Sequence, residues 1–257
     1  MSSKYTPSRP SKSKAQLVYG MQPVLEAFHA GRSIDKIFIL RTLKTDESEE
    51  VLAYAKARNV PVSRVPEEKL DKLTSKTHQG VVAFMASIDY QPLNHILDRV
   101  YEEAKMPLIL LLDRITDVRN LGAIARTAAC TGVHAIVIPV KGSATVGPDA
   151  IKTSTGALSH IPVCREESLK KVVNYLQEYG IQVVACTEKA SDTVYDLDLQ
   201  QPTALVMGSE ENGISEEILK LSDHLGKLPM DDKGVSSLNV SVATGAILFE
   251  AVRQRLR

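Results

Sequence analysis

Five uniformly apolar stretches in the second half of the chain constrain its fold more than any other feature. Strands that bury one face alternate apolar and polar residues, whereas near-continuous apolar runs are typical of parallel strands covered on both faces. The runs span residues 108–113, 134–140, 161–164, 181–187 and 203–208. Helical patterns lie around them at 121–131, 149–154, 166–179, 215–221 and 238–255. The pattern predicts an α/β domain built on a parallel sheet.

The front of the chain predicts a second, smaller α/β unit. Helical patterns at 19–30, 47–58 and 67–75 alternate with strand-like runs at 35–40, 62–65 and 80–88. Residues 89–106 look like a helical connector that leads into Pro107. We therefore expect a basic tail (1–16), a small domain (17–88), a linker (89–106) and a larger domain (107–257).

The formal net charge is zero, but the charge is unevenly distributed. The tail contains Lys4, Arg9, Lys12 and Lys14 and no acidic residue. Such a tail is either a solubilising leader or an arm that contacts phosphates with salt-dependent affinity, and charge alone leaves both interpretations open. The sequence shows no signal-peptide pattern, no apolar run of membrane-spanning length and three scattered cysteines, which predicts a soluble cytoplasmic protein with reduced thiols.

Three loops are the expected sites of chemistry, because ligands of open parallel sheets bind outside the carboxyl ends of the strands. The first loop follows residue 113 and leads to Asn120 and Arg126 at the start of a predicted helix. Taken alone, Asn120 fits a simple helix N-cap and Arg126 a simple surface charge.

The second loop reads VMGSEENGIS from residue 206 to 215. Gly208 ends a strand and permits close approach to the backbone, and Glu210 follows. Asn212-Gly213 predicts a turn, and Ser215 is the predicted cap of the next helix. The segment is neither a dinucleotide-binding GxGxxG nor a GxSxG nucleophile elbow. A strand–turn–helix corner without function fits it equally well.

The third loop, LPMDDKGVSSLNVSVA, begins at residue 228 and enters the last helix. It contains Gly234 and a cluster of polar side chains at Ser236, Ser237, Asn239 and Ser241. Such side chains at a helix entry either cap the helix or bind a polar ligand.

Together the three loops resemble a known family. The runs NLGAIARTA, LVMGSEENGIS and LPMDDKGVSSLNVSVATGAILFEAVRQR look like the three ordered motifs of the SpoU (TrmH-like) RNA 2′-O-ribose methyltransferases of the SPOUT class. The front segments LVYGMQPVLEAF and THQGVVA resemble the ends of the L30e-like substrate domain of many members. The match is closest to members that methylate a guanosine of 23S rRNA. One departure is Val118-Arg119 before Asn120, where relatives often carry proline and a small polar residue.

The resemblance implies a fold, a cofactor and a partner. It implies an α/β catalytic domain with a deep trefoil knot, S-adenosyl-L-methionine bound in a bent shape by backbone groups, and a homodimer that uses the last helix. The substrate would be RNA, with no DNA, membrane or metal involved. By motif position, the cofactor contacts are Gly208, Leu228 and Leu238.

The polar active-site set implied by the resemblance is Asn120, Arg126, Glu210, Ser237 and Asn239. Because a guanidinium stays protonated in proteins, we expect Arg126 to hold a phosphate and stabilise a developing alkoxide rather than to act as a base. Asn120 would position Arg126 or the ribose, and Glu210 would organise the loop. Ser237 and Asn239 would orient the nucleotide.

Two other interpretations stay open. The first is a tRNA ribose methyltransferase of the same family, although such tRNA enzymes often lack the front domain. A non-catalytic RNA-binding protein is the second alternative, and the presence of the polar set argues against it. Among the histidines, His78 fits either an RNA contact or a structural role, and His134 and His160 flank strands. Four phenylalanines and eight tyrosines, without tryptophan, do not identify a base-stacking surface.

Overall fold

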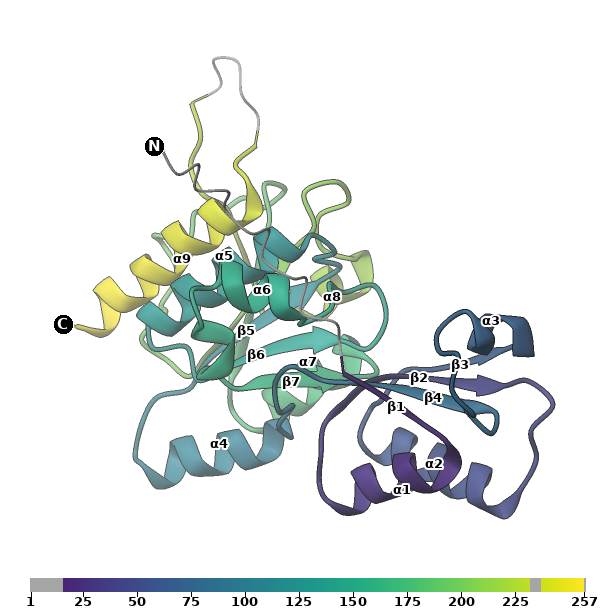
Figure 1. Ribbon diagram of the computed structural model, residues 1–257. Coiled ribbons are helices and arrows are strands. Elements are labelled where there is room, and N and C mark those ends of the chain that lie inside the picture. The colour runs from purple at the N-terminus through teal and green to yellow at the C-terminus, as the bar shows by residue number, and fades with distance from the viewer. Residues whose placement is uncertain (1–15, 232–236, 257) are drawn as a thin grey trace, which may run out of the picture.

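The protein consists of two α/β units, each built on its own sheet (Figure 1). The structure, a computed structural model, describes residues 16–231 and 237–256. Within these residues no helix is both long and apolar enough to cross a membrane. Because the description begins at residue 16, the basic tail (1–16) lies almost entirely outside it.

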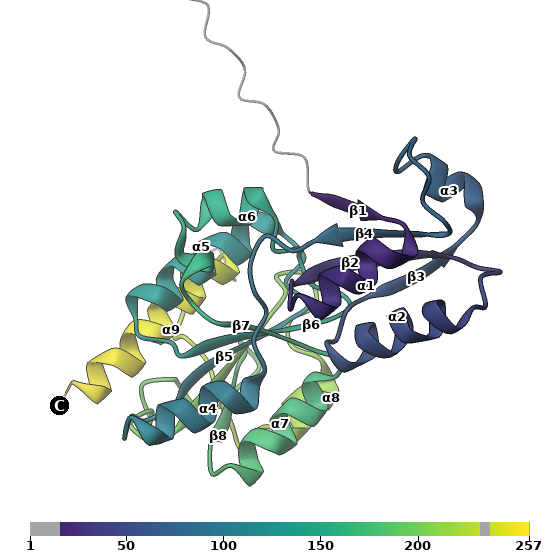
Figure 2. The ribbon, with the colours of Figure 1, turned by 60° about the horizontal axis from the view of Figure 1, so that its bottom comes forward.

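The first unit is a four-stranded sheet in the order β1-β4-β2-β3. β4 pairs antiparallel with both β1 and β2, and β3 pairs parallel with β2. Helices α1 and α2 lie together on one face of this sheet, and α3 lies at its far end (Figures 1 and 2). The elements are β1 (Leu17–Tyr19), α1 (Met21–His29), β2 (Ile34–Leu40), α2 (Asp46–Ala57), β3 (Val62–Val65), α3 (Glu67–Asp71) and β4 (Val81–Met85).

The first helix begins later than its sequence pattern predicted. Tyr19 belongs to β1 and pairs with Val82, and Gly20 turns the chain into α1 with a positive φ of 93°. The Gln79 side chain accepts a hydrogen bond from the Met21 amide at 3.2 Å, which satisfies one of the free N–H groups at the helix start. A three-residue strand is too short to carry a periodic signal, so the sequence did not show it.

The second unit confirms the predicted parallel sheet. Its order is β10-β8-β9-β5-β6-β7, and every pairing is parallel. The strands are β5 (Leu108–Asp113), β6 (Ala135–Pro139), β7 (Val163–Glu166), β8 (Gln182–Cys186), β9 (Thr203–Gly208) and β10 (His224–Gly226). The helices are α4 (Leu93–Glu102), α5 (Val118–Cys130), α6 (Pro148–Thr153), the 3₁₀ turn η1 (Ala157–Ser159), α7 (Leu169–Glu178), α8 (Glu216–Leu221) and α9 (Val240–Arg255).

Both faces of this sheet are buried, as the apolar runs predicted. On β5, Leu110 and Leu112 face the core under α5, α6 and α9, whereas Ile109 and Leu111 face the core under α4, α7 and α8. All of them are fully buried. Each such side chain contributes about 1.5–3 kcal/mol of transfer free energy, so the sheet is the stable platform on which its loops are held.

The expected linker (89–106) contributes to the core between the larger sheet and helices α4, α7 and α8. Helix α4 buries Leu93, Ile96, Leu97 and Val100 against the face that also carries α7. Because its apolar stripe packs on the larger sheet, α4 is fixed to the second unit rather than free between the two.

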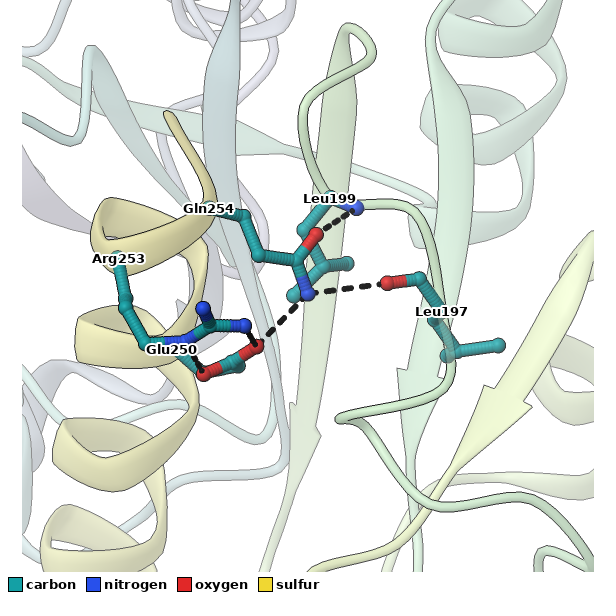
Figure 3. A network of polar contacts seen from close by, with 5 residues as sticks. All are labelled: Leu197, Leu199, Glu250, Arg253 and Gln254. Atoms are coloured by element: carbon teal, nitrogen blue, oxygen red, sulfur yellow. Dashed lines mark hydrogen bonds and ion pairs between the residues drawn. The ribbon is translucent and has the colours of Figure 1, made fainter. Parts of the chain in front are cut away.

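The last helix is fastened to the second unit at its C-terminal end (Figure 3). Gln254 donates to the Leu197 carbonyl at 3.0 Å and accepts from the Leu199 amide at 2.8 Å. Glu250 accepts from Gln254 and from the Arg253 guanidinium. Arg255 binds four further carbonyl groups, those of Met106, Pro107, Leu199 and Gln201. The last turns of α9 thereby bind the polar backbone of the loop before β9 and of the segment before β5.

A buried arginine joins the two units. Arg165 of β7 donates to the carbonyls of Ile34 at 2.9 Å and Asp35 at 3.0 Å, and its guanidinium lies 4.1 Å from the centre of the Tyr90 ring. The Tyr90 hydroxyl donates to the Asp35 carboxylate. Burial raises the pKa of Asp35 and lowers that of Arg165, with each partner's charge opposing the other's shift. Asn59 adds a hydrogen bond to the Arg165 carbonyl.

We expect Arg165→Met to loosen this junction. Methionine keeps the buried stem but leaves two carbonyls without their donor, which should lower the free energy of unfolding by about 2–4 kcal/mol in urea titrations. Arg64→Met, at an exposed position of β3, is the control and should change it by less than about 0.5 kcal/mol. Equal effects of the two substitutions would contradict the role of Arg165.

Candidate functional site

The candidate site lies where the chain order of the larger sheet reverses, between β5 and β9. Because all the strands are parallel, the loops after β5, β9 and β10 leave from the same edge. The buried Asp113 at the end of β5 accepts a hydrogen bond from the Ser215 amide at 2.7 Å. Arg114, with a φ of 61°, donates to the Gly213 carbonyl at 3.1 Å. These two residues hold the β9 loop against the β5 loop.

Gly208 occupies a position that only glycine fits. A Cβ there would lie 2.1 Å from the Gly213 carbonyl carbon and 2.3 Å from the Ile214 nitrogen. The backbone that approaches Gly208 most closely is therefore that of its own loop. The predicted turn at Asn212-Gly213 is present, since the Gly213 amide bonds to the Ser209 carbonyl and Gly213 has a positive φ of 61°. Ser215 precedes α8 but makes no side-chain capping bond.

Three polar residues, one from each loop, meet in a single cluster. Asn120 donates to the Glu210 carboxylate at 2.9 Å. Asn239 donates to the same carboxylate oxygen and to the Asn120 carbonyl oxygen at 3.0 Å. The Val240 amide also donates to Glu210 at 3.2 Å. Glu210 thus accepts from both neighbouring loops, and we call Asn120, Glu210 and Asn239 the polar triad.

The structure answers the capping questions differently for the two asparagines. The N-cap of α5 is Asp117, which accepts from the amides of Arg119 and Asn120, so Asn120 is in the first turn and not at the cap. The prediction that Asn120 opens the helix is wrong by three residues. Asn239 does cap α9 through its Oδ1 while its amide group serves the polar triad. A structural and a site role are combined in one side chain.

Arg126 lies apart from the polar triad. It is exposed on α5, six residues beyond Asn120, and has no hydrogen bond or ion pair within residues 16–231 and 237–256. Six residues correspond to a rise of about 9 Å along the helix. The guanidinium is therefore available to an external anion.

A cavity opens beside the polar triad at the ends of β8, β9 and β10. Three expected site residues line it, Leu228, Leu238 and Ser237. Gly208 does not, although its neighbour Met207 does. The remaining lining residues are Cys186, Thr187, Glu188, Gly226, Met230, Ala243 and Ile247. The cavity thus combines apolar walls with a few polar groups, as small-molecule sites do.

The cysteine in this cavity is not suited to nucleophilic catalysis. Burial raises the pKa of the Cys186 thiol to about 12, so the neutral thiol predominates at physiological pH. Burial has the same effect on Cys164, whose pKa is also raised to about 12. Within the described residues, no group of three or more His, Cys, Asp or Glu side chains could hold a metal ion.

The sequence analysis did not identify the residues that hold the site loops in place. It did name two loop residues that lie outside the part of the chain that the structure describes. Asp113, Arg114 and Asp117 were not singled out, although a buried acid at the end of an apolar strand signals such a role. Gly234 and Ser236 lie outside the described residues. Two of the histidines considered in the sequence have structural contacts. His78 contacts Asp71 and accepts from the Gly80 amide, and His134 accepts from the Leu108 amide.

Two family models match this chain. The model of the "SpoU rRNA Methylase family" matches residues 107–249. The model "RNA 2'-O ribose methyltransferase substrate binding" matches residues 17–91. The two matches together include both sheets and all residues of the polar triad.

The full-length relatives are bacterial methyltransferases. YacO of Bacillus subtilis (strain 168), assigned to the TrmH family of tRNA/rRNA methyltransferases, is 36% identical over 93% of this chain and 95% of its own. The SpoU methyltransferase AviRb of Streptomyces viridochromogenes, solved with AdoMet, superposes with a TM-score of 0.60 at 29% identity over 93% of this chain and 90% of its own. AdoMet-bound rRNA methyltransferase of Sinorhizobium meliloti gives 0.58 at 27% identity, with 94% and 88% covered.

We expect Gly208→Ala to distort the β9 loop. The added methyl group would overlap backbone atoms that cannot rotate away, so the free energy of unfolding should fall by at least about 2 kcal/mol. Gly147→Ala is the matched control, because nothing lies within 4 Å of its Cβ position. It should change the free energy by no more than about 1 kcal/mol in urea titrations. A well-tolerated Gly208→Ala would contradict the close packing described above.

Proposed function

The chain belongs to the SpoU family of RNA methyltransferases, and we propose that it methylates a ribose 2′-hydroxyl of RNA with S-adenosyl-L-methionine as methyl donor. The observation that carries this proposal is the polar triad, in which one side chain from each of the three motif loops meets beside a cavity. A non-catalytic RNA-binding protein would have no need to keep that arrangement.

The cavity fits the proposed cofactor chemically. Leu228, Leu238 and Ile247 offer an apolar surface for an adenine ring, and Thr187, Glu188 and Ser237 offer polar groups for a ribose and an amino-acid moiety. When bound, the cofactor supplies an activated methyl group on a positively charged sulfur. Gly208 acts indirectly in this proposal, because it allows the Gly213–Ile214 backbone to close the loop next to the cavity.

The chain's own task is then to align the 2′-oxygen and assist loss of its proton. Alignment alone supplies several kcal/mol in reactions of this type. Helical side chains tilt towards the helix N-terminus, so Arg126 extends towards the end of α5 that carries Asn120. There its exposed guanidinium can hold the adjacent phosphate and stabilise charge on the oxygen. The proton leaves to that phosphate or to water.

Each member of the polar set has a part in this proposal. Glu210 accepts from Asn120, Asn239 and the start of α9, and so organises the loops around the ribose. Asn120 positions the ribose. Ser237, which lines the cavity and precedes Asn239 by two residues, orients the nucleotide together with Asn239.

Ribosomal RNA is the favoured substrate, and we propose a guanosine of 23S rRNA. The support is the substrate-binding domain, because solved structures of a SpoU methyltransferase and of an rRNA methyltransferase match 93% and 94% of this chain. The Aquifex aeolicus TrmH/SpoU tRNA-modifying enzyme matches only 64%, at 30% identity and a TM-score of 0.53, covering 84% of its own length. A tRNA substrate is the alternative. The knot expected from the family resemblance stays a prediction.

We also propose a homodimer formed through α9. Val242 and Phe249 on this helix are each 56% exposed, and Leu256 just beyond it is 81% exposed. Residues 242, 249 and 256 are seven apart and share one face of a helix. Such an apolar stripe on an otherwise packed helix favours a second copy of the chain.

The reaction would take place in the cytoplasm. Cys130, Cys164 and Cys186 form no disulfide in the structure, and free thiols are typical of a reducing compartment.

The central test is methyl transfer itself. Purified protein is incubated with labelled S-adenosylmethionine and total RNA from cells that lack the endogenous enzyme, and labelled riboses are mapped after nuclease digestion. We expect one labelled 23S rRNA guanosine. Arg126→Ala should lower turnover about 10²- to 10³-fold, because a preorganised donor is removed. Arg99→Ala, exposed on α4, is the control.

Arg126→Lys separates a bidentate clamp from a simple point charge. Near-wild-type turnover in that variant would contradict the clamp. Label on tRNA instead of 23S rRNA would replace the substrate and keep the reaction. Absence of both cofactor binding and methyl transfer would favour the RNA-binding alternative.

The dimer has its own test. Phe249→Asp places a charge in the proposed interface, and the mass measured by light scattering should fall from that of two chains to that of one. Tyr195→Asp, 51% exposed and outside the helix, should leave the mass unchanged. A monomeric wild-type protein would contradict the dimer.

A further inference from the structure

One face of the N-terminal sheet is not covered by α1 and α2. These helices pack on the face that carries Ile37, Val81, Ala83 and Met85. Because successive side chains of a strand point to opposite faces, Lys36, Phe38, Val82 and Phe84 lie on the other face. Val82 is fully buried there, and the other three side chains are half-buried. No described helix lies over it between α3 and the larger unit (Figures 1 and 2). We call this surface the open face.

The strand register brings the aromatic residues of the open face together. Phe84 lies opposite Leu17 on one side and Lys36 on the other. In the next row, Val82 lies between Tyr19 and Phe38. The Phe38 and Phe84 ring centres are 5.8 Å apart at an interplanar angle of 65°. Residues 46 positions apart in sequence thus form one aromatic pair at the centre of the face.

The two rings are accessible rather than part of a core. Phe38, Phe84, Tyr19 and Lys36 are half-buried, and neither phenylalanine is a member of the core under α1 and α2. The Lys36 ammonium lies 4.7 Å from the Phe38 ring centre. A ring face that a flexible cation can cover is also within reach of a planar base, and the displaced ammonium would remain close enough to bind a phosphate.

We propose that the open face is a stacking platform for unpaired bases of the substrate RNA. Aromatic side chains on an exposed sheet are a common means of holding single-stranded nucleic acid, because every base has a π-face. The inference rests on the proposed function for the identity of the RNA. It assigns Phe38 and Phe84 as the stacking groups and Lys36 as a phosphate contact.

Charge and position favour RNA as the occupant. Lys36, and Ser63 opposite Phe38 on β3, also line a groove between the units, together with Lys141, Gly142, Ser143 and Thr145 after β6. The groove also contains Asp35 and Arg165, whose opposite charges face each other. A strand held on the face would meet these basic and hydroxyl side chains next. Gly142 approaches Arg114, which donates to Gly213 in the β9 loop. The groove therefore leads from the open face towards the candidate site. In the sequence, Lys4, Arg9, Lys12 and Lys14 precede β1.

The test measures RNA affinity without catalysis. The full chain is titrated with a fluorescent single-stranded oligoribonucleotide and with the same sequence as a duplex. We expect wild type to prefer the single strand and the Phe38→Leu/Phe84→Leu double variant to bind it about tenfold or more weakly, because leucine keeps the apolar volume and lacks the ring. Lys36→Ala should lower the salt dependence by about one phosphate contact.

Tyr101→Leu is the matched control, since Tyr101 is an exposed aromatic residue on α4, outside the open face. Its RNA affinity should equal that of wild type. Cofactor binding of the double variant should be unchanged, and its thermal unfolding should stay cooperative although loss of the aromatic pair lowers the midpoint by a few degrees. Unaltered RNA affinity in the double variant would overturn the proposed stacking platform. If the wild-type protein binds RNA but transfers no methyl group, only the proposed function is overturned.

Photocrosslinking gives a second readout that needs no variant. Wild-type protein is crosslinked to 4-thiouridine-containing RNA, and the attached peptides are identified by mass spectrometry. Crosslinks in residues 34–40 or 81–85 are expected. Crosslinks confined to other segments would overturn the proposal. A double variant that changes its oligomeric state but keeps its RNA affinity would also overturn it, because the open face would then be a protein interface.

Discussion

The contact between β5 and β9 is the constraint on which the rest of the site depends. These central strands pair along their full length, from Leu108 opposite Thr203 to Asp113 opposite Gly208. At their ends Asp113 accepts from Ser215, and Gly208 leaves space for the backbone at residues 213–214. Glu210 is then presented to Asn120 and Asn239 with little freedom. The polar triad is therefore a product of strand pairing and backbone packing before it is a product of side-chain chemistry.

The same platform fixes the position of the substrate-binding unit. Arg165 lies within strand β7 and reaches across to Ile34 and Asp35 at the start of β2. A guanidinium that binds two carbonyls and lies against Tyr90 allows few relative orientations of the two sheets. In the proposed function, an RNA held on the smaller unit would be presented to the larger one at a defined distance. The interdomain junction would then contribute to the reaction by positioning the two units, without a contact to the polar triad.

How far the sequence predicted this arrangement depended on the range of the forces involved. The parallel sheet and the strand 203–208 could be predicted from apolar runs, because a strand that is buried on both faces needs apolar residues at nearly every position. Asn120, Glu210 and Asn239 were found through their motifs, but their mutual hydrogen bonds join residues up to 119 positions apart. The Asp117 cap was missed because either Asp117 or Asn120 could serve chemically. Pairing of Phe38 with Phe84 depended on strand register, which no local pattern specifies.

Completion of the site during protein synthesis depends on helix α9, because this helix is made last. Its first residue is preceded by Asn239 in the polar triad, while its last turns bind the loop around Leu197–Leu199 and the carbonyls of Met106 and Pro107. During synthesis on the ribosome, the segment that contains Asn120 emerges long before the residues that fasten this helix. The nascent chain can form the first sheet and most of the second while its site is still incomplete. The polar triad can therefore be completed only after Asn239 has emerged, and a chain that ends before Asn239 would contain every strand of both sheets but lack one member of the triad.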